Sequence, residues 1–507
     1  MKAECRFFIA YYHAVMAMTY GGVPIIREAA EEISGESLLL KQEPFYDVVD
    51  WAANELLEAS RQLPASYDEA NKYGRITSLI CLAMRARLLT FAASDLVNGN
   101  PDPEMQAMTN VDGVKIFSAT FEANHWKRAK DANKLLIEEA EKAGHALYKE
   151  YLSDGVAIDP FLSYQNMMMK TYKEGNTEII FPRTKDNAGW FDDCALPRGA
   201  GGLGSLGVTQ LLVDDFFMKD GKMPILGYNN SGNTQTAIIN PETEYSETGY
   251  STEDDVRATN WHYAVAGASA SGDSHVVAPK NTFNMYCNRE PRFYISVVYN
   301  EQYHWGKGKA TNFFFNGEDG QPSHDNPSAG YLIRKHVDPT FVHSTNTGTY
   351  KSRQGILYRL AEAYLSYAES ALEYSIAKGT YNSEKEDIVK CINKIRERAG
   401  IPQYGASGLG IPTEPEEMRK LIRRERRVEM NCEGGLRWFD LRRWKEAENV
   451  LNGKFYGMNM LAEKDNRDDF YKRVSYQTRK FISYWWPIPQ DEIDKNPNLK
   501  QMPGWMN

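Results

Sequence analysis

A pair of carboxylates on the apolar face of one helix constrains the fold of this chain more than any other sequence feature. Met418, Ile422 and Val428 recur at the spacing of a single helix face. Glu425 and Glu429 fall on that same face. A carboxylate that is buried without a cationic partner costs several kcal/mol. The fold must therefore bring cations to this face, and we predict that both glutamates are mostly buried and contact arginines.

Cations are abundant just beyond that helix. After Gly434-Gly435 the chain places Arg437, Arg442 and Arg443 among tryptophan, phenylalanine and leucine residues. We interpret residues 415 to 447 as two helices packed as a hairpin, in which these arginines pair with the two glutamates and the aromatic rings fill the seam. A phosphate-binding patch is the weaker alternative, because acidic residues are interspersed with the arginines and neutralise much of their field.

Charge and residue spacing exclude several classes of function. The net charge of −9 gives no reason to expect a nucleic-acid partner. No apolar run reaches the roughly 18 residues that a membrane-spanning helix needs. The six cysteines have no CxxC or metal-knuckle spacing, and neither HExxH nor EF-hand spacing is found. We therefore expect no metal and no cofactor.

Helical periodicity is strong towards both ends of the chain. The leading helices around Phe7, Leu79 and Leu357 repeat a pattern of large and small residues that is typical of the first helix of a tetratricopeptide unit. The pattern favours a mainly α fold with a tetratricopeptide-like scaffold of helical pairs, and a generic helical bundle is the alternative. The predicted helices cover residues 3–20, 46–63, 75–95, 126–143, 354–374, 385–399 and the 415–447 pair.

The middle of the chain differs from both ends. Glycine, asparagine, proline, serine and aromatic residues dominate there, and only short runs at 175–183 and 292–300 have the character of strands. We divide the chain into an N-terminal helical half (1–150), a loop-rich insertion (151–350) and a C-terminal helical half with its tail (351–507). Long loops on a rigid scaffold usually carry function, so we expect the ligand site in the insertion.

Aromatic residues of the insertion are the candidate ligand-binding residues. They lie in polar, glycine-rich surroundings rather than on helix faces. An exposed flat ring offers an apolar platform to the C–H face of a sugar, while nearby Asp and Asn side chains bond its hydroxyls. The alternative is that these rings pin long loops onto the scaffold. The candidates are Trp190, Phe191, Trp261, Tyr303 and Trp305.

No catalytic constellation stands out, and we expect a protein that is not an enzyme, with no catalytic residue. Gly199 to Gly204 spells GxGxxG, but Pro197 argues against the preceding strand that a dinucleotide site requires. Acidic doublets such as Asp192-Asp193 are typical of turns and helix caps, and their positions cannot place two carboxylates in one cleft. No GxSxG nucleophile elbow is present.

Several segments, in the same order along the chain, resemble the SusD/RagB family of outer-membrane nutrient-binding lipoproteins. One departure is Glu290, where the family more usually has aspartate. The segments are AYYHAVMAMTYGGVPII (10–26), GVTQLLVDDFFMKDGKMPI (207–225), NREPRFYISVVYN (288–300), GYLIRKHVDP (330–339), RLAEAYLSYAESALE (359–373), INKIRERAGIP (392–402), RRERRVEMNCEGGLRWFDLRRW (423–444) and YWWPIPQDEIDKNPNLKQMPGW (484–505).

The resemblance implies a SusD-like fold and a non-catalytic protein at the outer-membrane surface. Such a protein binds a polysaccharide or oligosaccharide and delivers it to a SusC-like TonB-dependent transporter. It also implies a lipoprotein held to the membrane by an N-terminal lipid. No apolar leader precedes Cys5, so we expect that the family's N-terminal segment is missing from this chain. Two alternatives stay open: a helical-repeat scaffold that binds peptides or proteins, and a glycan-degrading enzyme.

Overall fold

Helices form most of the regular structure in the computed structural model of the chain. None of the helices in the described ranges is both long and apolar enough to cross a membrane. The structure describes residues 1–27, 39–67, 69–185, 188–257, 276–304, 307, 309–320, 325–339, 353–406 and 408–505.

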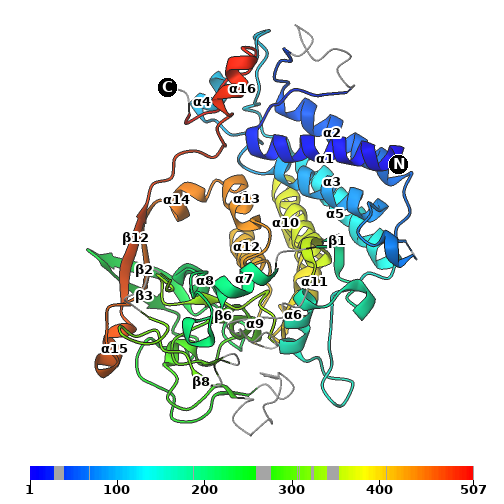
Figure 1. Cartoon of the computed structure of the whole chain (residues 1–507). Helices are drawn as coiled ribbons and strands as arrows, with labels where there is room; N and C mark the ends of the chain where they lie inside the picture. The colour runs from blue at the N-terminus through cyan, green and yellow to red at the C-terminus, as the bar shows by residue number, and fades with distance from the viewer. Residues whose placement is uncertain are drawn as a thin grey trace.

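The N-terminal helices pack side by side, as the blue and cyan ribbons of Figure 1 show. The third of them, α3, is buried along nearly its whole length because most of its residues are apolar. Its first turn is capped by the Thr77 hydroxyl, which accepts a hydrogen bond from the Ile80 N–H. The helices predicted in this part are confirmed within three residues at each end. They are α1 (Lys2–Tyr20), α2 (Phe45–Ser60), α3 (Ser78–Ala93) and α5 (Ala123–Lys142).

The C-terminal helices join this group through α10, which packs on α5 on one side and on α12 on the other (Figure 1). The mainly α, SusD-like fold class predicted from the sequence is confirmed. The helices of this part are α10 (Leu360–Lys378), α11 (Tyr381–Ala399), α12 (Pro415–Glu429), α13 (Leu436–Arg443) and α14 (Ala447–Leu451).

Two predicted elements are wrong at the residue level. Residues 355–359 form a strand, β10 (Gly355–Arg359), instead of the start of a helix, because they pair with β1 (Ile179–Arg183). The predicted strand at 292–300 is mostly a helix, α9 (Pro291–Ser296), and only its last part forms β6 (Val297–Val298). Pro291 stands in the first turn of α9, where its fixed φ favours a helix and its missing N–H costs nothing.

A four-stranded antiparallel sheet combines strands from two distant parts of the chain. Its order is β11–β12–β3–β2, so strands from the C-terminal part pair with a hairpin of the insertion. After β12 the chain crosses back to the N-terminal helices, where Trp485 is buried against Phe117 (Figure 1). The strands are β2 (Ile225–Ser231), β3 (Thr234–Ile239), β11 (Gly453–Met458) and β12 (Arg473–Arg479).

Glu425 and Glu429 are fully buried, which confirms the prediction made from their position on the apolar face of α12. A Glu425 oxygen lies 2.7 Å from the guanidinium of Arg292, and a Glu429 oxygen lies 2.6 Å from that of Arg359. Among the described residues, the arginine partners are Arg292 and Arg396 for Glu425, and Arg292, Arg359 and Arg398 for Glu429.

The source of these arginines differs from the prediction. They belong to α9, β10 and α11, because α12 packs its apolar face against α10 and α11 rather than against α13. The arginines of α13 have other roles. Arg443 pairs with Glu369 of α10 at 2.5 Å, and Arg442 donates a hydrogen bond to the carbonyl of Tyr484. The predicted hairpin is therefore two helices joined across a glycine turn, each of which binds other elements.

Candidate functional site

A short helix of the insertion, α7 (Ala188–Ala195), presents one tryptophan to solvent. The side of this helix that bears Trp190 is open, and 63% of that residue is exposed. Its neighbour Phe191 is half-buried against the core of the insertion, and its ring meets the His336 ring edge-on at 5.9 Å. Trp190 is thus an exposed ring on a helix that Phe191 anchors to the core of the insertion.

A buried ion pair fixes the orientation of α7. Both oxygens of Asp192 accept hydrogen bonds from the Arg353 guanidinium, at 2.7 and 2.9 Å. Burial raises the pKa of Asp192 above its ordinary value, although Arg353 opposes that rise. A bidentate pair of this kind gives a defined geometry. The helix that carries Trp190 is therefore attached rigidly to the residues that lead into β10.

The GxGxxG segment folds back against the end of α7. A Cβ atom on Gly202 would lie 2.3 Å from the carbonyl oxygen of Leu196, so only glycine fits there. The N–H of Gly204 donates to the same carbonyl at 2.8 Å. The segment follows a helix, α7, rather than the strand that a dinucleotide site requires. Gly202 thus allows the close approach of the two backbone segments.

The hairpin that carries Tyr303 touches the same loop. Lys307, at the turn between β7 (Tyr303–His304) and β8 (Lys309–Ala310), forms an ion pair with Asp319. The other Asp319 oxygen accepts a hydrogen bond of 2.7 Å from the Gly199 N–H. Asp319 therefore ties the hairpin to the loop that ends α7. We call α7, its loop and this hairpin the α7 platform.

The five candidate residues have different surroundings. Trp190 is exposed on the α7 platform, whereas Phe191 and Tyr303 are half-buried and pack against the core of the insertion. No ring contact joins Trp190 to Tyr303 in the described part of the chain. Trp261 and Trp305 lie outside the described residues.

A second aromatic surface was missed by the sequence analysis, which used the C-terminal segment 484–505 only as a family marker. It is a hollow of about 510 Å³ at the C-terminal segment, which we call the aromatic hollow. Trp486 stands there with 50% of its surface exposed. The density of tryptophan near the C-terminus is the signal that could have indicated it. The aromatic residues that line it are Trp438, Phe481, Trp485, Trp486 and Trp505.

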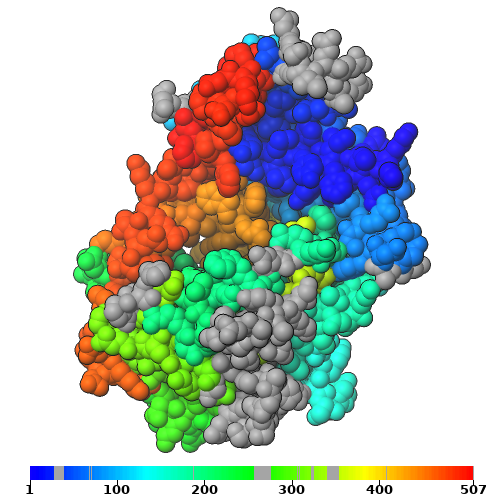
Figure 2. Space-filling view, viewed as in Figure 1, coloured from blue at the N-terminus to red at the C-terminus, as the bar shows by residue number. Residues whose placement is uncertain are grey.

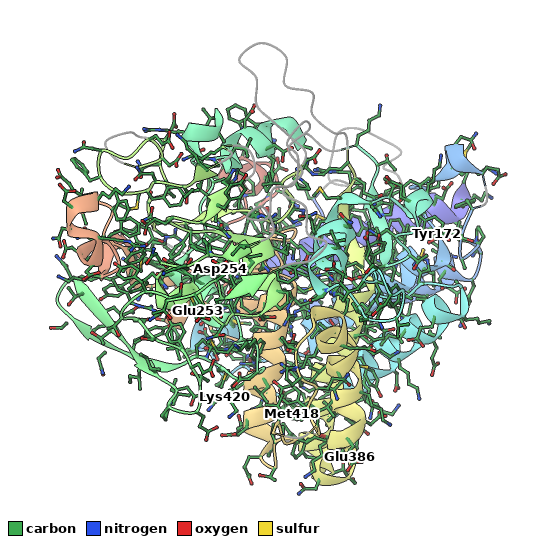
Figure 3. All side chains as sticks on the ribbon, turned by 90° about the horizontal axis from the view of Figure 1, so that it is seen from below. Tyr172, Glu253, Asp254, Glu386, Met418 and Lys420 are labelled. Atoms are coloured by element: carbon green, nitrogen blue, oxygen red, sulfur yellow. The ribbon has the colours of Figure 1, made fainter. Side chains whose placement is uncertain are left out.

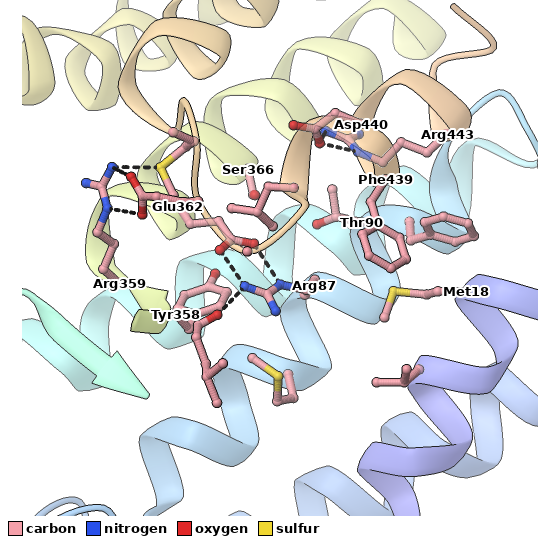
Figure 4. Close-up of a pocket in the computed structure, with 18 of the residues that line it drawn as sticks. Met18, Arg87, Thr90, Tyr358, Arg359, Glu362, Ser366, Phe439, Asp440 and Arg443 are labelled. Carbon is pink, nitrogen blue, oxygen red and sulfur yellow. Dashed lines mark hydrogen bonds and ion pairs between the residues drawn. The ribbon is translucent and has the colours of Figure 1, made fainter. Parts of the chain in front are cut away.

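A cavity of about 190 Å³ lies where the N-terminal and C-terminal helices meet (Figure 4). Its charged wall is closed by ion pairs. Arg87 binds both oxygens of Glu362 at 2.6 and 2.8 Å, and Arg443 lies 3.0 Å from Asp440. These guanidinium groups are already satisfied by their neighbours, so the cavity belongs to the packing of the scaffold. Within the described residues, no cluster of three or more His, Cys, Asp or Glu side chains could hold a metal ion.

Solved structures place this fold in the class of SusD-like proteins. A protein named BT4246 is 26% identical to this chain and superposes with a TM-score of 0.77, over 99% of this chain and 83% of its own. A SusD-like protein from Bacteroides fragilis is 24% identical, with a TM-score of 0.67 over 99% of this chain and 79% of its own. A SusD-like carbohydrate binding protein from the same species is 20% identical and shows the fold alone, with a TM-score of 0.64 over 98% and 79%.

The family model of the SusD family matches residues 163–505, and the chain belongs to that family. The resemblance described from the sequence motifs is thereby confirmed. A search of curated proteins finds no significant match.

Proposed function

We propose that this protein is a non-catalytic glycan-binding protein of the cell surface, and that the α7 platform is its binding surface. The observation that carries the proposal is the Trp190 ring, 63% exposed on a helix that a buried ion pair holds in place. An exposed aromatic ring offers apolar surface that a ligand can cover, and a preorganised ring loses little entropy on binding. Membership of the SusD family supports this function, since its members bind nutrients.

The ligand in this proposal is a polysaccharide or oligosaccharide, which is passed to a SusC-like TonB-dependent transporter in the outer membrane. One SusD-like neighbour is described as carbohydrate binding, which supports the ligand class. The helical scaffold offers the rigid surface that docking onto a transporter needs. Membrane attachment through an N-terminal lipid belongs to the same proposal. Trp261 and Trp305 remain proposed contributors to the site.

Calorimetry with a panel of soluble glycans tests the proposal. Trp190→Ala should weaken binding of the best glycan at least tenfold, which corresponds to about 1.4 kcal/mol. Trp486→Ala is the matched control, because it removes an equally large exposed ring from the aromatic hollow. Unchanged affinity in Trp190→Ala would contradict the assignment of the site.

Two further outcomes separate the alternatives. If no glycan binds and oligopeptides bind saturably, the protein is a peptide-binding scaffold. If incubation with the panel releases reducing ends, and a single carboxylate substitution abolishes that release, the protein is an enzyme.

A further inference from the structure

The outer face of α12 lines a surface hollow that is rich in cations. The hollow has a volume of about 330 Å³, and α8 (Gln210–Asp215), α13 and α14 complete its wall. In Figure 2 the orange segment lies between the red C-terminal segment and the green insertion. Figure 3 shows Met418 directed towards α10 and α11 and Lys420 directed away from them. We call this the cationic hollow. Its charged lining residues are Arg419, Lys420, Arg423, Arg424, Arg427 and Arg437, with Asp215, Glu416 and Glu446.

Some of these cations are fully paired. Arg419 binds both oxygens of Glu373, at 2.5 and 2.7 Å, and also pairs with Glu416. Its charge is therefore used within the fold. Arg423 is less well paired, since its nearest carboxylate oxygen, on Glu446, is 3.3 Å away.

Two arginines that line the hollow share one carboxylate, and a third has no ion pair among the described residues. Arg424 and Arg427 each reach Asp215 at 3.4 Å, which is long for a charged hydrogen bond. No described residue accepts a hydrogen bond from Arg437. One nitrogen of Arg424 is likewise buried without an acceptor among the described residues. Burial and repulsion from Arg427 lower the pKa of Arg437 to about 10. The cationic hollow therefore has more cationic groups than carboxylates to pair with them.

The chemistry of these groups defines the ligand. A guanidinium presents parallel N–H donors that match the two oxygens of a carboxylate, sulfate or phosphate. The volume falls at the lower end of the range for small-molecule sites, so the hollow has room for more than a bare ion. Leu441 and Val450 supply an apolar wall beside the charges. This combination suits a small organic molecule with an oxyanion group.

We propose that the cationic hollow binds the carboxylate or sulfate group of a small acidic molecule, through Arg424, Arg427 and Arg437. If the protein is a glycan-binding protein, as proposed above, that molecule is an acidic sugar; the oxyanion site itself does not depend on that function. The cationic hollow and the α7 platform share no residue, so each is tested separately.

The test is calorimetry and thermal unfolding of the full chain at constant ionic strength, with sodium glucuronate, sodium sulfate and glucose as probes. Glucuronate should bind at least tenfold more tightly than glucose and raise Tm. Arg437→Gln should weaken glucuronate binding at least tenfold while the protein stays folded, because Arg437 has no ion pair to lose among the described residues. Arg424→Gln is a second variant with the same expected loss. Arg61→Gln, which removes an exposed surface charge, is the control.

The outcomes separate the sources of the oxyanion. Binding of glucuronate above sulfate supports an organic acid, and binding of sulfate alone, lost in Arg437→Gln, supports a site for a free anion. The proposal fails if neither anion binds more tightly than glucose, or if both arginine variants fold and keep wild-type affinity. Trp190→Ala should keep glucuronate binding at the cationic hollow, so loss of the α7 site does not affect this result.

Discussion

Both faces of α12 bring arginines and carboxylates together, but the pairing of these charges differs between the two faces. On the inner face, Glu425 and Glu429 are enclosed by arginines of other elements at hydrogen-bond distances. On the outer face, Arg424 and Arg427 of α12 itself lie at 3.4 Å from a shared Asp215. The number of carboxylates available to each guanidinium distinguishes the two faces, because the abundance of arginine is common to both.

The inner face is part of a balanced network that is closed to solvent. Each cation touches at least one carboxylate, and the charges cancel within the set. A group of this kind specifies how the elements fit together. Its cations are Arg292, Lys335, Arg359, Arg396 and Arg398, and its carboxylates are Glu178, Glu290, Glu425, Glu429 and Glu433.

The largest effect is expected at the centre of the inner network. Glu429→Gln should lower the free energy of unfolding by about 3–5 kcal/mol, because it leaves Arg359 and Arg398 buried without full compensation. Urea unfolding measures this loss. Glu416→Gln, on the outer face, is the matched control and should change stability by less than about 1 kcal/mol. Equal effects at the two positions would remove the distinction between the faces.

The acid response of the inner network should be the next largest effect. Burial opposes ionisation of Glu433, but Arg359 and Lys335 outweigh it and lower the pKa to about 2 from an ordinary value of 4.5. A lowered carboxyl pKa stabilises the fold above the unfolded pKa, and this stability is lost as pH falls towards the folded pKa. Glu433 should therefore account for about 3 kcal/mol of stability that disappears between about pH 4.5 and pH 2.

The free energies of unfolding of the wild type and of Glu433→Gln are measured across that pH range. The difference between the two curves gives the contribution of Glu433 to stability. The wild-type curve should fall more steeply than the variant curve. Parallel curves would mean that Glu433 titrates in the folded state as it does in the unfolded state. The comparison by difference is needed because burial raises the pKa of Glu290, whose contribution has the opposite sign.

Sequence periodicity indicated the inner face correctly but not its partners. The pattern of α12 depends only on neighbouring residues, and it shows that Glu425 and Glu429 must be buried. The partners of Glu429 stand 137, 70 and 31 positions away, so they depend on how α9, β10 and α11 pack. A local pattern carries no information on such contacts. We therefore assigned the pairing to the nearest arginines, in α13, and that assignment was wrong.

The candidate sites also depend on long-range contacts that a local sequence pattern does not show. Composition indicated that Trp190 stands in a polar segment, but its exposure depends on the Asp192–Arg353 pair, whose members are 161 residues apart. The cationic hollow was judged neutral because acidic residues alternate with its arginines in the sequence. In the fold, those acidic residues are divided between the two faces. Glu425 and Glu429 point inwards and leave the outer arginines with few partners.

The smallest effect is expected on the outer face. Arg437→Gln removes a charge that has no ion pair among the described residues and is repelled by Arg427. The variant should be as stable as the wild type or more stable by up to about 1 kcal/mol at low ionic strength, and the difference should shrink in molar sodium chloride because salt screens the repulsion. Urea unfolding at two salt concentrations, without oxyanions in the buffer, measures it. A loss of more than about 1 kcal/mol, in the range of a buried pair, would place Arg437 among the structural arginines. Its unpaired guanidinium would then be a part of the scaffold, and the outer face of α12 would differ from the inner face only in exposure.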